Sequence, residues 1–200
     1  MQKRDASTPR RSRRIWIIGG TLALAAGVIA ALVFQPWLAL IDVRVDDEIP
    51  VAVATPAPSP TAEPQISAPS EDGAPEASAP PAPAGPVDLL SGTFISHEHA
   101  TSGTVRVIEN PDGSRYLAIE DLATTNGPDV HVWLSAGPVV EGFDGWFTAA
   151  QHPFVDLGQI KGNLGDQLYE IPDDVDLDRF RTVDLWCVQF SVSFGAAALG

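Results

Sequence analysis

The sequence predicts an all-β domain, a small β-sandwich or barrel of about seven strands, preceded by one transmembrane helix and a disordered Pro-rich linker. Three observations lead to this prediction. The run from Ile15 to Phe34 carries no charge, eleven prolines fall between Pro50 and Pro86, and the later residues form short β-type runs separated by turn residues. The chain therefore divides into a basic tail (1–14), a membrane segment (15–41, core 15–34), a linker (42–86) and a β domain (87–200).

The apolar segment 15–41 predicts a membrane anchor. Its core of twenty uncharged residues would form a helix about 30 Å long, which matches the hydrocarbon thickness of a bilayer. Six of the twelve Lys and Arg residues lie in the first fourteen positions and acidic residues follow the segment, so we expect a cytoplasmic N-terminus. The run is longer than the apolar region of a cleaved signal peptide, and no small-residue cleavage site follows it closely. We therefore expect an uncleaved, single-pass signal anchor in the cell membrane and an extracytoplasmic C-terminal domain.

The linker, residues 42–86, has the composition of an unfolded spacer. Between Pro50 and Pro86 its prolines alternate with Ala, Ser and Thr, and large apolar residues are almost absent. Such a segment cannot bury enough apolar surface to fold. Proline keeps a chain extended at about 3.1 Å per residue, so these residues would reach on the order of 100 Å. We expect a stalk that holds the last domain away from the membrane.

Residues 87–200 show β patterning and no sustained helical period. Turn chemistry separates the candidate strands, and Asn110-Pro111-Asp112-Gly113 is the clearest hairpin signal because Pro presets φ and Gly accepts positive φ. Several short strands at this spacing favour a sandwich or barrel. The expected strands are 93–96, 103–109, 115–121, 129–135, 155–161, 167–171 and 182–194.

The last expected strand, 182–194, carries the only cysteine of the chain. Alternation assigns Trp186, Val188, Phe190, Val192 and Phe194 to one face, which we expect to be the core stripe. Cys187 falls on the other face, where the pattern passes from apolar to polar, so we expect it to be partly accessible.

Composition excludes some partners and bonds. The β domain has five basic and seventeen acidic residues, a formal charge of −12, so nucleic acid would be repelled and is excluded as a partner. The single cysteine excludes an intramolecular disulfide. Hydrolase, kinase and dehydrogenase motifs are absent from the sequence, which favours an accessory protein over a stand-alone enzyme.

Several blocks of the β domain resemble the DM-thirteen domain family, in the family's order over roughly residues 89–199. The first blocks are Gly92-Thr93-Phe94, His99 to Val105 and Thr125 to Leu134; the later ones are Ile160 to Pro172 and Leu185 to Gly195. The resemblance implies a small, mainly β extracytoplasmic domain. It also implies a proposed role in electron transfer through a characteristic cysteine, either as a bare thiol or as a ligand to a prosthetic group. Cys187 occupies that position, and His99 matches a histidine of the first block.

The chemistry of Cys187 and His99 stays open at the level of sequence. A free cysteine is commonly a small buried hydrophobe, and a reactive one needs a nearby cation or helix N-terminus. His97 and His99 would point to one side of a strand, and with Cys187 they could bind copper or zinc, but the residues that follow the cysteine in blue-copper sites are missing. A c-type haem motif is absent; noncovalent haem stays open, without a motif that selects it.

Two functions from different classes follow. The leading hypothesis is a membrane-anchored redox or electron-transfer accessory that acts through Cys187, with His99 as a second site residue and an extracytoplasmic redox protein as partner. The alternative is a non-catalytic cell-surface binding or adhesion module in which Cys187 only packs. For that alternative the stalk and the aromatic residues Trp146 and Phe147 would carry the interaction. A third reading is a covalent dimer through Cys187.

Overall fold

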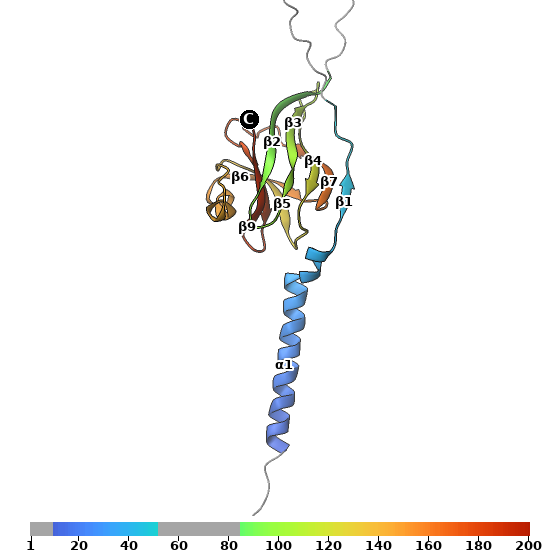
Figure 1. Ribbon diagram of the computed structural model, residues 1–200, viewed down its shortest axis with the longest axis vertical. Helices are drawn as coiled ribbons and strands as arrows, with labels where there is room; N and C mark the ends of the chain where they lie inside the picture. The colour runs from blue at the N-terminus through green and yellow to red at the C-terminus, as the bar shows by residue number, and fades with distance from the viewer. Residues whose placement is uncertain (1–9, 52–84) are drawn as a thin grey trace, which may run out of the picture.

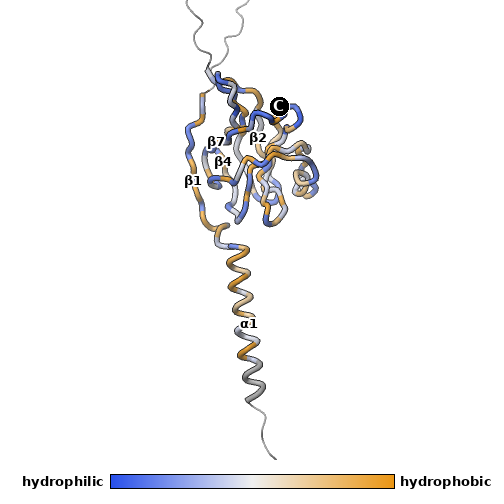
Figure 2. The backbone as a smooth tube through the Cα atoms, turned by 180° about the vertical axis from the view of Figure 1, so that it is seen from behind, coloured by the Kyte–Doolittle hydropathy of each residue, from blue (hydrophilic) through white to orange (hydrophobic). Residues whose placement is uncertain are grey.

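The computed structural model describes residues 10–51 and 85–200 (Figure 1). Helix α1, Arg10–Phe34, is followed by one short 3-10 helix, η1, Pro36–Leu40. Residues Trp16–Phe34 form a helical stretch long and apolar enough to cross a membrane, by length and composition alone. Figure 2 shows this helix as a largely hydrophobic rod that projects from the domain.

The β domain is a single nine-stranded sheet that curls into a half-barrel, in the order β1-β7-β4-β3-β2-β9-β8-β5-β6. This confirms the predicted all-β class. The strands are β1 Arg44–Asp46, β2 Val87–Ser96, β3 Ser102–Glu109, β4 Arg115–Ala123, β5 Val130–Ser135, β6 Phe154–Gln159, β7 Leu164–Ile171, β8 Thr182–Cys187 and β9 Val192–Ala198. Two further 3-10 helices, η2 Phe143–Phe147 and η3 Ala149–Gln151, lie between β5 and β6.

Strand β2 joins the two halves of the sheet. Its first part, up to Thr93, pairs with β3, and its last three residues pair with β9 instead. The sheet can therefore curl around one core, which contains fully buried residues from both halves, among them Leu117, Leu134 and Leu185. Burial of such side chains is the main favourable term in folding, about 25 cal/mol per Å² of apolar surface.

The predicted single strand 182–194 is wrong: it is a hairpin of β8 and β9. Cys187 pairs with Val192, and residues 188–191 form the turn, with Ser191 at φ 53°. The predicted core stripe is confirmed for Trp186, Val192 and Phe194, which are buried. It is wrong for Val188 and Phe190, which lie in the turn with 41% and 46% exposure. The face that holds Val183, Leu185 and Cys187 is the one in the main core.

The predicted linker begins too early, because part of it is folded. Residues 44–46 form β1, which pairs in parallel with β7. The buried side chain of Asn163 accepts a hydrogen bond from the Val43 backbone N–H at 2.7 Å and donates to the Asp42 carboxylate at 2.8 Å. Glycine makes the approach of β1 possible: a Cβ on Gly165 would lie 2.0 Å from the Val45 carbonyl oxygen.

The expected stalk therefore does not separate helix from domain. Only the nine residues 35–43 connect the end of α1 to β1, so the domain begins next to the helix. Residues 52–84, which contain most of the predicted spacer, lie outside the described residues. The chain on either side of them, β1 and β2, belongs to the sheet, and both ends emerge at the same end of the domain in Figure 1.

Candidate functional site

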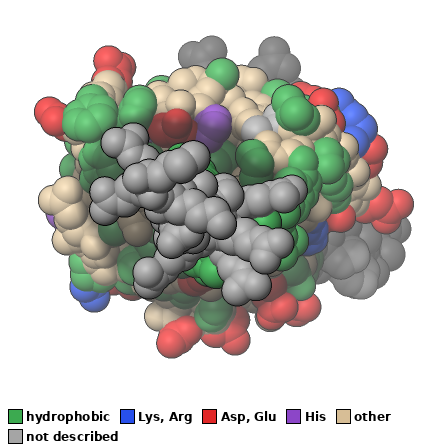
Figure 3. Space-filling model, turned by 90° about the horizontal axis from the view of Figure 1, so that it is seen from below, with side chains coloured by type: hydrophobic (Ala, Val, Ile, Leu, Met, Phe, Trp, Pro, Cys, Tyr) green, Lys and Arg blue, Asp and Glu red, His purple; other side chains and the backbone are tan. Residues whose placement is uncertain are grey.

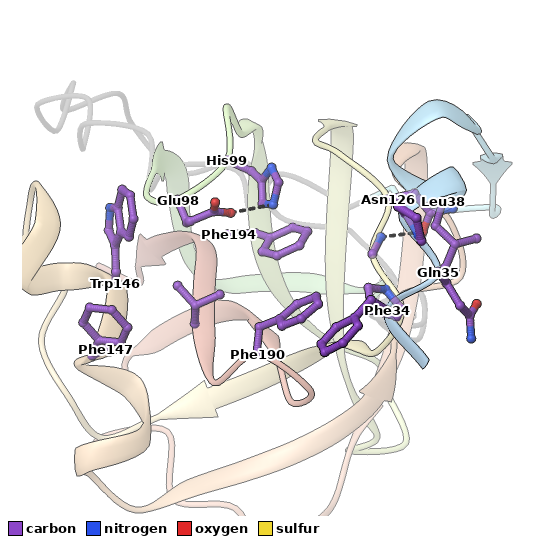
Figure 4. Close-up of a pocket in the computed structure, with 14 residues that line it drawn as sticks. Phe34, Gln35, Leu38, Glu98, His99, Asn126, Trp146, Phe147, Phe190 and Phe194 are labelled. Carbon is purple, nitrogen blue, oxygen red and sulfur yellow. Dashed lines mark hydrogen bonds and ion pairs between the residues drawn. The ribbon is translucent and has the colours of Figure 1, made fainter. Parts of the chain in front are cut away.

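An apolar pocket lies where the end of α1 meets the domain (Figure 4). Its volume is about 560 Å³, within the range of small-molecule sites. Its walls come from the end of α1 and η1, the turn after β2, the segment before β5, η2, and the β8–β9 hairpin. The lining residues with side chains of interest are Phe34, Leu38, Glu98, His99, Asn126, Trp146, Phe147, Phe190, Val192 and Phe194.

Aromatic rings make up much of the pocket wall. Phe34 at the end of α1 stacks on Phe190 of the β8–β9 turn, with ring centroids 5.8 Å apart and planes 8° from parallel. Trp146 and Phe147 of η2 line the opposite side in Figure 4. Viewed from below, hydrophobic side chains gather on the underside of the domain, and acidic side chains lie mainly at its periphery (Figure 3).

His99 brings polar chemistry to this pocket. Its Nε2 lies 2.5 Å from the Glu98 carboxylate, and its ring tilts over Phe194 with centroids 3.9 Å apart. A carboxylate acceptor fixes the tautomer of a neutral imidazole, here with the proton on Nε2 and a lone pair on Nδ1. The residue that the sequence predicted as a site residue therefore lies on a pocket wall, and the pair can accept a hydrogen bond from a ligand.

His97 has different partners from His99, contrary to the expected histidine pair. β2 ends at Ser96, so the two histidines lie in a turn and the alternation of a strand does not apply. His97 is buried; its Nε2–H donates to the Val140 carbonyl at 3.0 Å, and its Nδ1 bonds Ser193 Oγ at 2.7 Å. Burial lowers the pKa of His97.

Asp184 completes a buried polar chain that sequence reasoning missed. Its Oδ2 lies 2.9 Å from Ser193 Oγ, and Oδ1 has no partner within the described residues. Burial raises the pKa of Asp184 to about 7, while the Ser193 hydroxyl opposes the rise. The signal was present in the sequence, because a carboxylate in the apolar run Val183-Asp184-Leu185 is costly to bury unless it is hydrogen-bonded.

Cys187 is not partly accessible as expected but fully buried, with 0% exposure, in the main core. Burial raises the pKa of its thiol, and the backbone N–H groups of Phe190 and Gln189 partly oppose this. The thiol is absent from the pocket lining, although its strand partner Val192 and the turn residue Phe190 line the pocket. A buried thiol also cannot reach a second chain, so the covalent dimer is incompatible with this fold.

The residues do not fit a copper centre that joins Cys187 to the two histidines. His97 is held by Val140 and Ser193, His99 by Glu98, and the thiol lies in the core. No group of three His, Cys, Asp or Glu side chains in residues 10–51 and 85–200 is arranged to hold a metal ion. The thiol cannot reach a haem in the pocket either, so a haem there would have His99 as its imidazole ligand.

Fold and site together define a small all-β domain with a ligand-sized apolar pocket against an apolar helix. The family model described as Electron transfer DM13 matches residues 93–199, more than half of the chain. The chain therefore belongs to the electron transfer DM13 family, which is the DM-thirteen family that the sequence resembles. No curated protein and no solved structure matches the chain.

Proposed function

We propose that this protein is a membrane-anchored accessory in electron transfer, with α1 as the anchor and the β domain outside the cytoplasm. The family description supports a redox-related role. The apolar stretch of α1 and the basic residues before it support anchoring with a cytoplasmic N-terminus. The observation that carries the proposal is the pocket with His99 at the end of α1, where a partner or ligand can approach the domain at the membrane boundary.

Cys187 is proposed as the redox-responsive group behind this pocket. Nucleophilic attack needs an exposed thiolate, whereas electron exchange needs only a short distance, so burial does not exclude this role. The β8–β9 turn joins the thiol to the pocket wall, because Phe190 lines the pocket and the Gln189 and Phe190 amides face the sulfur. A change in the redox state of Cys187 would then alter the pocket wall through this turn.

The redox role is tested on membranes that contain the full chain. With NADH added as the electron donor, the rate of reduction of ferricyanide is measured for wild type, Cys187→Ala and membranes without the protein, at matched protein level. We expect wild type to raise the rate and Cys187→Ala to abolish the increase. Equal rates with and without the protein would contradict the electron-transfer role. An unchanged rate in Cys187→Ala would show that the cysteine takes no part in electron transfer, without contradicting the role of the protein.

The orientation is tested separately with right-side-out membrane vesicles. Protease added outside should digest the β domain only if the domain is extracytoplasmic. Protection of the domain in sealed vesicles, followed by digestion after detergent is added, would reverse the proposed orientation.

A binding module without redox activity is the second candidate, and the aromatic surface of η2 favours it. Phe143 is 67% exposed and packs edge-on against Phe147 at 5.4 Å. Large exposed apolar side chains that cluster in this way mark interaction sites. Replacement of both phenylalanines by serine should then abolish adhesion to a partner surface, while Cys187→Ala should have no effect. The reverse pattern would exclude the binding module.

A further inference from the structure

We propose that the pocket beside His99 binds the ring of a lipid-soluble quinol or quinone, which enters from the bilayer with its tail lying along α1. The inference rests on the proposed membrane anchoring and names the ligand class of that site.

The position of the pocket makes it accessible from lipid. Phe34 is the last residue of the apolar stretch of α1, and it forms part of the pocket wall. The domain is attached at the same level, because the Gln189 side chain donates a hydrogen bond to the Val33 carbonyl at 2.7 Å. If α1 spans the bilayer, the helix-side wall therefore lies at the boundary between hydrocarbon and headgroups. A ligand dissolved in the membrane can reach it without crossing water.

The walls suit a flat, apolar ring. Phe34 and Phe190 lie parallel to one another, and Phe194, Trp146 and Phe147 add further aromatic surface. Aromatic rings bind other flat rings by offset stacking or edge-to-face contact, in addition to the apolar area that is buried. A charged or sugar-like ligand would lose its hydration against these walls and find few polar partners in return, because most of the lining is apolar.

The polar part of the pocket selects a ring with a hydroxyl or carbonyl substituent over a plain acyl chain. Glu98 takes the Nε2–H of His99, which leaves Nδ1 as an acceptor. Among the described residues no hydrogen bond reaches Nδ1. The phenolic O–H of a quinol can donate to it, and the protonated imidazole can donate to a quinone carbonyl. An acyl chain would contact the aromatic walls and leave Nδ1 of His99 without a partner.

The test uses the full chain in phosphatidylcholine nanodiscs, titrated with the stable quinol-site probe 2-heptyl-4-hydroxyquinoline N-oxide, whose fluorescence is quenched when it binds. We expect saturable binding at one probe per chain, and competition by decylubiquinone. His99→Gln should weaken binding at least tenfold, and His152→Gln, outside the pocket lining, should leave it unchanged. Phe190→Ala should weaken binding, whereas Val188→Ser, in the same turn but not in the lining, should not.

Two outcomes would overturn the inference. One is the absence of saturable binding while the near-ultraviolet circular dichroism shows a folded domain. The other is binding that Phe190→Ala abolishes but His99→Gln does not change, because an acyl-chain site would behave in this way. Either outcome leaves the electron-transfer role untouched, since that role is measured by ferricyanide reduction and its dependence on Cys187. Loss of the ferricyanide effect with probe binding intact would instead contradict the proposed function alone.

Discussion

The buried polar chain of Asp184, Ser193 and His97 can hold its protons in two arrangements without moving a heavy atom. In the neutral arrangement, Asp184 donates to Ser193, and the Ser193 hydroxyl donates to His97 Nδ1. In the charged arrangement, protonated His97 donates to Ser193, which donates to the Asp184 carboxylate. In both, Nε2–H of His97 faces the Val140 carbonyl. Burial raises the pKa of Asp184 and lowers that of His97, so it favours the neutral arrangement.

Asp184 should make the protein less stable as pH rises. The folded form keeps a proton up to a pKa of about 7, while the unfolded form loses it near its ordinary value of about 4. The free energy of unfolding should therefore fall between about pH 4 and pH 7, by about 4 kcal/mol for this group alone. The lowered pKa of His97 acts in the opposite direction below about pH 6.5.

The variant Asp184→Asn isolates this effect, because its amide can donate to Ser193 as the protonated acid does. Denaturant unfolding of the full chain in detergent, followed by tryptophan fluorescence, should show that wild type loses stability relative to Asp184→Asn as pH rises. Asp178→Asn, at an exposed site, is the matched control and should follow wild type. Parallel profiles for wild type and Asp184→Asn would contradict the raised pKa.

Cys187 should be inert toward thiol reagents in the folded protein. Its sulfur lies in the core and burial raises its pKa, so reaction with a soluble disulfide reagent requires opening of the β8–β9 hairpin. We expect the folded chain to react roughly a hundredfold more slowly than the denatured chain. Rapid stoichiometric labelling of the native protein, measured by absorbance, would show that the thiol is accessible.

At the scale of single elements, the β8–β9 turn shows what sequence patterning can miss. Apolar and polar residues alternate from Val188 to Phe194, straight through the turn, and residues 188–191 include none of the Gly, Pro, Asn or Asp residues that mark turns. The family resemblance, the strand class and the hairpin at Gly113, which has φ 86°, were predictable because their signals are local. The burial of Cys187 was not, since it depends on which face of β8 turns toward the core that residues of distant strands such as Leu117 of β4 complete.

Strand β1 offers a test at this scale. Gly165 has φ 91°, and its Cβ position is filled by the Val45 backbone, whereas Gly113 has φ 86° with open space around it. Gly113→Ala therefore carries only the backbone cost of a left-handed alanine, about 1–2 kcal/mol. Gly165→Ala adds the expulsion of β1 and should cost at least about 2 kcal/mol more. Equal losses of unfolding free energy for the two variants would show that β1 is not paired with β7.

At the scale of the whole molecule, the distance between helix and domain depends on residues 35–43, not on the proline-rich segment. The composition of residues 42–86 predicts a spacer, but it could not reveal that residues 44–46 form β1. Lys161 and the Leu168 backbone N–H both bond the Asp47 carboxylate, which fixes the chain to β7 just before the segment begins. These contacts could not be predicted from a local sequence pattern, because they join residues more than a hundred positions apart.

Deletion of residues 60–75 should therefore leave the domain at the same height above the membrane. The remaining seventeen residues between Val51 and Gly85 can still span roughly 50 Å, so the sheet is not strained by the loss. Energy transfer between a dye on the domain and a labelled lipid should be unchanged. Insertion of ten Gly and Ser residues after Leu40 is the control, and should reduce the transfer. A change in energy transfer after the deletion would show that the proline-rich segment does set the distance between the domain and the membrane.

The pairing of β1 with β7 also sets an order of assembly. β1 leaves the ribosome first among the strands, yet its partners, such as Asn163 for Val43, follow 120 residues later. Contacts between such distant residues form late, because the intervening chain must be closed into a loop. Until then β1 is joined to the rest of the nascent domain only through the intervening chain. In the finished sheet β1 covers the edge of β7, which could otherwise pair with a neighbouring chain. The close seating of the sheet beside the end of α1 is therefore reached only when the domain has finished folding.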